Sequence, residues 1–203
     1  MLLNNTLKRE LCIVSILGIG LSSIIIFFLI PALPSQGSFV TPQAVKGNQI
    51  VSQAVIGLPI RLKIPKIKVN APVEHVGLTR DGAMGVPKSI ANTAWFALGP
   101  RPGEIGTAVI DGHYGFWKNG KRGVFNNLHK LRKGDRIYVE DGKGKMITFV
   151  VREIKRYDPN ADASEVFSSS DGKAHLNLIT CEGVWDAISK NYSKRLVVFT
   201  DKE

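Results

Sequence analysis

The chain has 203 residues, of which 44% are hydrophobic and 22% charged, with a net charge of +10 and two cysteines. This composition excludes a disordered chain and fits one ordinary domain plus an appendage. The two cysteines and four scattered histidines show no metal-ligand spacing, so we expect no metal and no cofactor. No basic stripe is interleaved with aromatic residues, which argues against nucleic acid as a partner.

The appendage is an apolar run at residues 11–30 that contains no charged residue. Its length suits a transmembrane helix, which needs about 20 apolar residues. Lys8 and Arg9 precede the run, and the next basic residue is Lys46. The positive-inside rule therefore predicts a single-pass anchor with residues 1–10 in the cytoplasm and the rest of the chain outside the cell. A cleaved signal peptide and a buried core helix are the alternatives.

Residues 31–57 are rich in Pro, Ser, Gln and Gly, and their composition predicts a linker. Residues 58–203 then form the predicted extracellular domain. A net charge of +9 remains once Lys8, Arg9 and Glu10 are set aside. Such a charge suits an anionic membrane or wall surface, although simple solubility explains it equally well.

The extracellular part reads as short strands separated by turn residues, with little helical periodicity. Residues 60–69 alternate apolar and basic side chains and are broken at Pro65, which predicts a bend. The remaining predicted strands are in 106–115, in a hairpin of 134–141 with 145–157, in 175–181 and in 194–200, while 89–99 reads as a short helix or a loop. This spacing is typical of a mainly β domain, a closed barrel or a sandwich.

Cys181 ends the strand-like segment HLNLITC, directly before Glu182 and Gly183. Cys12 falls in the predicted membrane run, so the two cysteines cannot pair. An unpaired thiol outside the cell is a liability, which raises the expectation that Cys181 reacts with a substrate. The alternative is a buried strand cysteine.

His113 and Arg195 are the other candidates. His113 follows an Asp-Gly turn at a strand end and has Gly112 and Gly115 close by, a setting in which the backbone must pass another group closely. Arg195 begins the last strand, where its guanidinium is suited to bind a carboxylate or an oxyanion. An ordinary strand-edge charge is the alternative for Arg195, and Lys194 is its rival.

In combination these blocks resemble the sortase family, the membrane-anchored cysteine transpeptidases of mainly Gram-positive bacteria. The resemblance rests on LKIPKIKVNAPV, RPGEIGTAVIDGHYG, NNLHKLRKGDRIYV, LNLITCEG and KRLVVFT, in this order behind an N-terminal anchor. It implies an eight-stranded β-barrel with short helices. It also implies that Cys181 is the nucleophile, His113 the general acid and base, and Arg195 the group that stabilises the oxyanion or holds the substrate, with Thr180 helping to line the site.

The resemblance further implies a substrate and an acceptor. The substrate is a secreted protein with a C-terminal signal similar to Leu-Pro-x-Thr-Gly, cleaved between Thr and Gly through a thioester. The acceptor is an amine of a cell-wall precursor or a pilin lysine. Two features bear on the sortase class: the segment 182–194 reads as a short loop, and the chain shows no second membrane run. These features make the chain most similar to sortase classes D, E and F, of which F is preferred.

Three other functions remain open from the residues. A cysteine hydrolase uses the same groups with water as acceptor. A non-catalytic anchored β-domain binds wall polymer through its charge and needs no reactive thiol. A wall-crosslinking L,D-transpeptidase carries its His shortly before its Cys in one block, whereas His113 and Cys181 lie in separate blocks.

Overall fold

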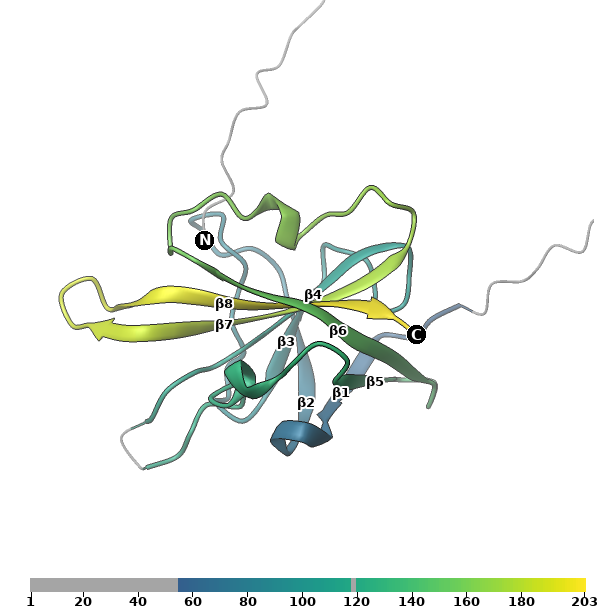
Figure 1. The fold of residues 1–203 in the computed structure, drawn as a ribbon, viewed down its shortest axis with the longest axis horizontal. Helices are drawn as coiled ribbons and strands as arrows, with labels where there is room; N and C mark the ends of the chain where they lie inside the picture. The colour runs from purple at the N-terminus through teal and green to yellow at the C-terminus, as the bar shows by residue number, and fades with distance from the viewer. Residues whose placement is uncertain (1–54, 118–119) are drawn as a thin grey trace, which may run out of the picture. The chain divides into compact units, whose positions relative to one another are not determined.

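The computed structural model describes residues 55–117 and 120–203 (Figure 1). The predicted cytoplasmic segment 1–10, the predicted anchor 11–30 and residues 31–54 of the predicted linker lie outside the described residues. Across the two described ranges, none of the helices has the length and apolar character that crossing a membrane requires.

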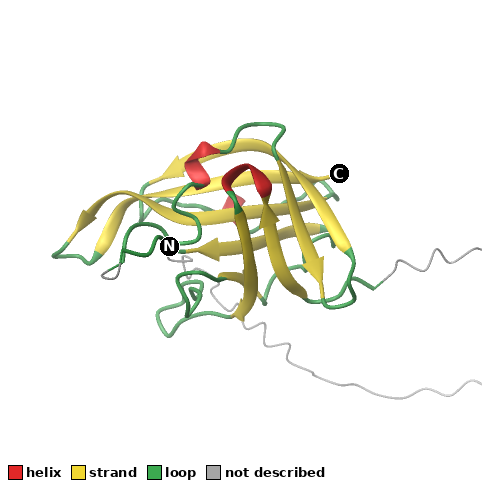
Figure 2. Cartoon of the chain, turned by 90° about the horizontal axis from the view of Figure 1, so that it is seen from below, coloured by secondary structure: helices red, strands yellow, loops and turns green. Residues whose placement is uncertain are grey.

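The described residues form eight β-strands that close into one barrel in the order β1-β2-β3-β4-β7-β8-β6-β5 (Figures 1 and 2). Most neighbours are antiparallel, whereas β2 with β3 and β4 with β7 are parallel. This closed barrel confirms the mainly β fold expected from the sequence. The strands are β1 Pro59–Ile64, β2 Val69–Val76, β3 Thr93–Phe96, β4 Gly106–Gly112, β5 Arg136–Asp141, β6 Met146–Tyr157, β7 Ala174–Asp186 and β8 Asn191–Lys202.

Three short 3₁₀ helices, η1 Pro65–Ile67, η2 Leu128–Lys130 and η3 Ser164–Val166, are the helices in the described part of the chain. The bend predicted at Pro65 is confirmed, because β1 ends at Ile64 and η1 begins at the proline. Lys68 follows η1 with a φ of 57° and lets the chain turn back into β2.

Two segments differ from the sequence prediction. The segment 89–99 was expected to be a short helix or a loop, but Thr93–Phe96 forms β3, paired with β2 and β4. A four-residue strand is too short to show a period, so tertiary pairing decides its structure. The segment 182–194 is not a short loop, because β7 continues to Asp186 and β8 begins at Asn191. Figure 1 shows this hairpin projecting beyond the rest of the barrel.

The wall formed by β4, β7 and β8 is apolar on both faces. Alternate residues, Ile110, Leu178 and Val198 among them, point into the main core. The residues between them belong to a second cluster outside the barrel, where Val166 of η3 and Phe167 cover Ile179 and Val197. Asn177 holds this cover in place, since its Nδ2 donates to the Val166 carbonyl at 2.8 Å. This outer face carries the candidate site.

Candidate active site

Strand register brings Cys181, His113 and Arg195 to one end of the outer face. Cys181 of β7 lies directly opposite Arg195 of β8. On the other side, Asp111 of β4 pairs with Ile179 of β7 in parallel, and His113 and Cys181 each follow two residues later. Because side chains alternate along a strand, residues two apart share a face, so all three candidates belong to the outer face.

Two clefts meet at Cys181. The aromatic cleft has a volume of about 630 Å³, and the apolar cleft has a volume of about 240 Å³. The aromatic cleft is lined by His113, Tyr114, Phe116, Trp117, Cys181, Trp185, Lys190, Asn191 and Tyr192. The apolar cleft is lined by Ala83, Met84, Gly85, Val86, Asp111, Phe167, Ile179, Cys181 and Arg195. Cys181 therefore borders both clefts, with His113 in one and Arg195 in the other.

Cys181 is a free, half-buried thiol. Burial raises the pKa of this thiol, the positive charge of Arg195 lowers it, and the negative charge of Asp111 raises it again. The balance leaves the pKa of Cys181 above that of an ordinary cysteine. The thiol is thus mostly protonated at neutral pH, and its ionisation depends on two charges on the neighbouring strands.

His113 is oriented by the backbone. Its Nε2 lies 2.7 Å from the carbonyl oxygen of Pro87. A carbonyl only accepts hydrogen bonds, so Nε2 carries a proton and Nδ1 is the ring atom left to exchange a second one. The Trp117 ring packs edge-on against the imidazole with 5.5 Å between centroids.

The two glycines beside His113 are required by close contacts, as the sequence predicted. A Cβ at Gly112 would lie 2.5 Å from the buried ring of Phe125. Gly115 has a φ of 87°, and a Cβ there would collide with the Tyr192 hydroxyl. Both positions need glycine because β4 and the residues after it pass directly over neighbouring side chains.

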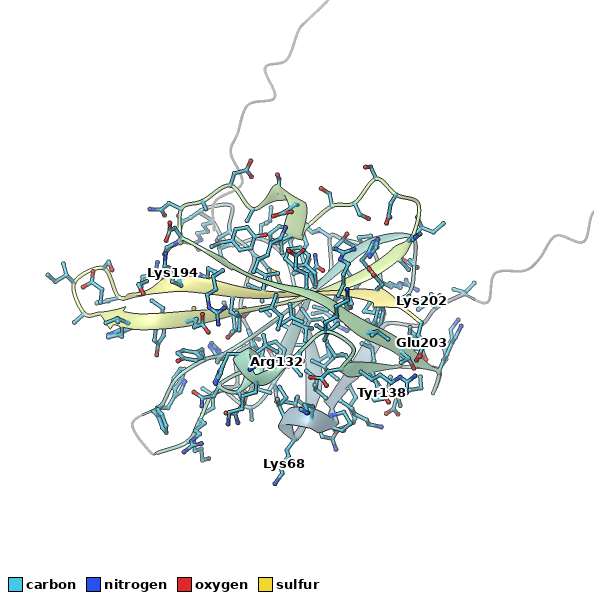
Figure 3. The ribbon with its side chains drawn as sticks, in the orientation of Figure 1. Lys68, Arg132, Tyr138, Lys194, Lys202 and Glu203 are labelled. Atoms are coloured by element: carbon cyan, nitrogen blue, oxygen red, sulfur yellow. The ribbon has the colours of Figure 1, made fainter. Side chains whose placement is uncertain are left out.

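Arg195 is held at the base of the hairpin. Its Nη1 donates to the carbonyl oxygens of Tyr192 and Lys194 at 3.1 and 3.0 Å, and its Nη2 donates to Oδ1 of Asn191 at 2.6 Å. Lys194, the rival candidate, is paired with Glu182 in register and forms an ion pair with Asp158 away from the clefts. Figure 3 labels Lys194 on the projecting arm of β8, with Lys202 and Glu203 near the other end of that strand.

Thr180 faces away from Cys181. It is 1% exposed, and its hydroxyl donates to the Gly112 carbonyl at 2.6 Å. Adjacent residues of a strand point to opposite faces, which explains why Thr180 is inside the barrel wall and Cys181 outside it. The contact ties β7 beside Cys181 to β4 beside His113. A direct contact of Thr180 with substrate stays a prediction.

Asp111 and the aromatic lining are not among the site residues predicted from the sequence. Asp111 precedes His113 by two residues, and that spacing on a strand would have placed both side chains on one face. Trp185 and Tyr192 would have been found by continuing β7 and β8 into the segment read as a loop. In the register of the hairpin these two residues are partners, and their ring centroids are 5.1 Å apart.

A cluster of His, Cys, Asp or Glu side chains suited to a metal ion is not found within residues 55–117 and 120–203. The reactive groups that the site brings together are the thiol of Cys181, the imidazole of His113 and the guanidinium of Arg195. These are the groups of nucleophilic acyl transfer by a cysteine.

A free cysteine that borders one cleft with a histidine and another with an arginine, on the wall of a closed barrel, is an arrangement suited to acyl transfer by a cysteine. The family model described as Sortase domain matches residues 62–203, more than half of the chain. The chain therefore belongs to the sortase family. Sortases are cysteine transpeptidases of cell-wall sorting, and the family implies this activity for the chain.

Solved sortase structures share the fold. Sortase A from Corynebacterium diphtheriae, a lid mutant, is 22% identical with a TM-score of 0.56, covering 74% of this chain and 73% of that chain. Sortase C-1 from Actinomyces oris is 24% identical with a TM-score of 0.55, covering 71% and 74%. Sortase C1 from Streptococcus agalactiae, in complex with MTSET, is 25% identical with a TM-score of 0.55, covering 71% and 68%. The search of curated proteins returned no match.

Proposed function

We propose that this chain is a membrane-anchored transpeptidase in which Cys181 takes an acyl group from a sorting signal and passes it to an amine. The observation that carries the proposal is the position of Cys181 at the junction of two clefts. A transferase must bind two substrates, one after the other, beside one nucleophile. The apolar cleft suits the acyl side of a signal peptide, and the aromatic cleft suits the leaving group and then the acceptor.

Acylation begins when the Cys181 thiol gives its proton to Nδ1 of His113 and the sulfur attacks the scissile carbonyl carbon. Negative charge develops on the carbonyl oxygen, and Arg195, in the apolar cleft, stabilises that charge. His113 then donates the proton from Nδ1 to the leaving amine as the C–N bond breaks. The products are a thioester on Cys181 and a free amine, which departs through the aromatic cleft.

Transfer reverses these roles. An acceptor amine enters the aromatic cleft and attacks the thioester carbon. Its proton passes to Nδ1 of His113, the C–S bond breaks, and the thiolate of Cys181 recovers the proton. The product is an amide between the signal peptide's acyl group and the acceptor. Water in place of the amine makes the same site a hydrolase, so the two functions differ only in how the thioester is resolved.

The substrate and location are part of the same proposal. The substrate is a secreted protein with a C-terminal signal similar to Leu-Pro-x-Thr-Gly, and the acceptor is an amine of a cell-wall precursor or a pilin lysine. What supports them is membership of the sortase family. The extracellular location is supported by the uncharged run 11–30 and the basic residues before it. The proposed class, F-like among D, E and F, stays a prediction.

The test is the intact mass of the full chain in mild detergent after mixing with Leu-Pro-x-Thr-Gly peptides. We expect an added mass equal to the peptide's acyl part, absent in Cys181→Ala. Added glycine or lysine amines should then release the acyl group as an amide in preference to the acid. No adduct on a reactive thiol would favour the wall-binding domain, and release only as the acid would favour the hydrolase.

A further inference from the structure

Asp111 is a carboxyl group in an otherwise largely apolar cleft. The apolar cleft is formed by Ala83, Met84, Gly85, Val86, Phe167 and Ile179, and its polar groups are Asp111, Cys181 and Arg195. Cys181 and Arg195 have roles in the proposed reaction, but Asp111 has none. An aliphatic signal side chain would be served better by an aliphatic residue at this position, because it would exclude water from the half-buried Asp111 carboxyl without donating a hydrogen bond to it, which costs free energy.

The described residues leave the Asp111 carboxyl with spare hydrogen-bonding capacity. It accepts from the backbone N–H of Gly112. In the described part of the chain no ion pair joins it to Arg195, whose guanidinium donates to Asn191 and to backbone carbonyls. A carboxyl group has about four lone-pair sites, so most of them remain open to a ligand in the cleft.

Asp111 is not placed to orient the histidine. The His113 ring forms its hydrogen bond with the Pro87 carbonyl. Asp111 shares the outer face with His113 but opens into the other cleft. The position of Asp111 therefore points to contact with the bound acyl chain rather than to support of the imidazole.

We propose that Asp111 selects sorting signals in which the side chain entering the apolar cleft bears an uncharged hydrogen-bond donor, an amide or a hydroxyl, in place of an aliphatic group. This inference rests on the proposed function, since it assigns the apolar cleft to the acyl side of the signal. An amide or hydroxyl donates to the open carboxyl oxygen and satisfies it. A cationic side chain would also satisfy it, but it would share the small cleft with the guanidinium of Arg195, which repels it.

The protonation of Asp111 is compatible with a neutral ligand. Burial raises the pKa of this carboxyl to about 7, against the backbone hydrogen bond from Gly112 and the attraction of Arg195. Near neutral pH the group is therefore present in both forms. An amide side chain suits both, because its NH₂ donates to the carboxylate and its C=O accepts from the carboxylic acid.

The test compares paired peptides on the full chain in mild detergent. The peptides are based on Leu-Pro-x-Thr-Gly, and the three positions before Thr are changed one at a time. At each position one pair of peptides carries Asn or Leu, and a second pair carries Thr or Val. The kcat/KM for acylation of Cys181 is measured for each peptide by intact mass. At the position that enters the cleft, we expect the donor-bearing peptide to be preferred by about tenfold, the worth of one hydrogen bond left unmade. Asp111→Leu should reverse that preference.

Asp81→Leu is the matched control, since Asp81 is exposed and does not line the cleft. It should keep the wild-type preference. An unchanged preference in Asp111→Leu, or a wild-type preference for the aliphatic peptides, would overturn the inference.

Peptide affinity for Cys181→Ala separates this inference from the proposed function. In one outcome, the ratio of the affinities for the two peptides of a pair depends on Asp111 while the wild-type chain forms no thioester. In that case the selectivity stands and the transpeptidase proposal fails. If a thioester forms equally with both members of every pair, the transpeptidase proposal stands and the selectivity fails.

Discussion

Cys181 and Arg195 are directly opposite one another on the antiparallel strands β7 and β8. Their side chains share the outer face of the barrel wall, and the positive charge of Arg195 lowers the pKa of the thiol against the larger effect of burial. The same arginine holds the base of the hairpin through Tyr192, Lys194 and Asn191. The nucleophile's ionisation and the geometry of the hairpin are thereby linked through one side chain.

The first prediction concerns the pH dependence of Cys181 alkylation. Because burial and Asp111 raise the thiol pKa more than Arg195 lowers it, the rate of reaction with iodoacetamide should still be rising with pH where a free cysteine peptide has levelled off. Arg195→Ala should move the inflection of the curve of alkylation rate against pH to higher pH, and Asp111→Asn should move this inflection to lower pH. An inflection at or below that of the free peptide would contradict this charge balance.

The second prediction concerns stability and Asp111. Its pKa is raised from 3.8 to about 7, mainly by burial. Between these values the folded chain binds a proton that the unfolded chain does not, so the free energy of unfolding falls as pH rises from about 4 to about 7. Asp111→Asn does not titrate. Relative to the wild type, the variant should therefore gain stability between pH 4 and pH 8.

Urea unfolding of the full chain, followed by tryptophan fluorescence at both pH values, measures this gain. Asp81→Asn, at an exposed carboxyl, serves as the control and should show no comparable change. A difference between wild type and Asp111→Asn that is the same at pH 4 and pH 8 would be inconsistent with the raised pKa.

The third prediction distinguishes two roles for Thr180. Thr180→Val leaves the buried Gly112 carbonyl without its side-chain donor and should cost about 1–3 kcal/mol of unfolding free energy. Thr180→Ser keeps the hydroxyl and should cost less. If Thr180 acts by holding β4 beside His113, acylation should slow in Thr180→Val with kcat reduced and KM little changed. A rise in KM with kcat unchanged would instead indicate contact with substrate.

The strands that carry the candidate residues were predictable because their patterns are local. Apolar runs and glycine turns marked β4, β7 and β8, and the order of the His, Cys and Arg blocks indicated the family. Of the two charges that act on the Cys181 thiol, Arg195 was predicted from the sequence, but Asp111 was not. Asp111 and Cys181 line one cleft because β4 pairs in parallel with β7, a pairing of segments that are far apart in the sequence.

His175 illustrates the same point outside the site. The sequence marks it only as the start of a strand, but it is 3% exposed and both ring nitrogens bond to carboxylates. Nδ1 lies 2.8 Å from Asp201, and Nε2 lies 2.9 Å from Asp171. The bond to Asp201 depends on the register of β7 with β8, and long-range pairing of this kind leaves no local signal.

The variant Trp185→Ala shows whether one thiol serves both clefts. Trp185 lines the aromatic cleft and is absent from the apolar one. In one rapid-mixing experiment on the full chain, acylation of Cys181 by peptide and release of the acyl group by added amine are followed by intact mass. Ile188→Ala, a highly exposed site on the same hairpin, is the control.

We predict that Trp185→Ala raises the amine concentration for half-maximal transfer by up to about tenfold, because the acceptor loses an aromatic contact. Acylation should slow by a smaller factor, because only the leaving group of the signal peptide lies in the aromatic cleft and the acyl part lies in the apolar one. Ile188→Ala should change neither quantity. An acylation rate that falls as far as transfer does, or an amine dependence that does not change, would contradict the assignment of separate clefts to the two substrates.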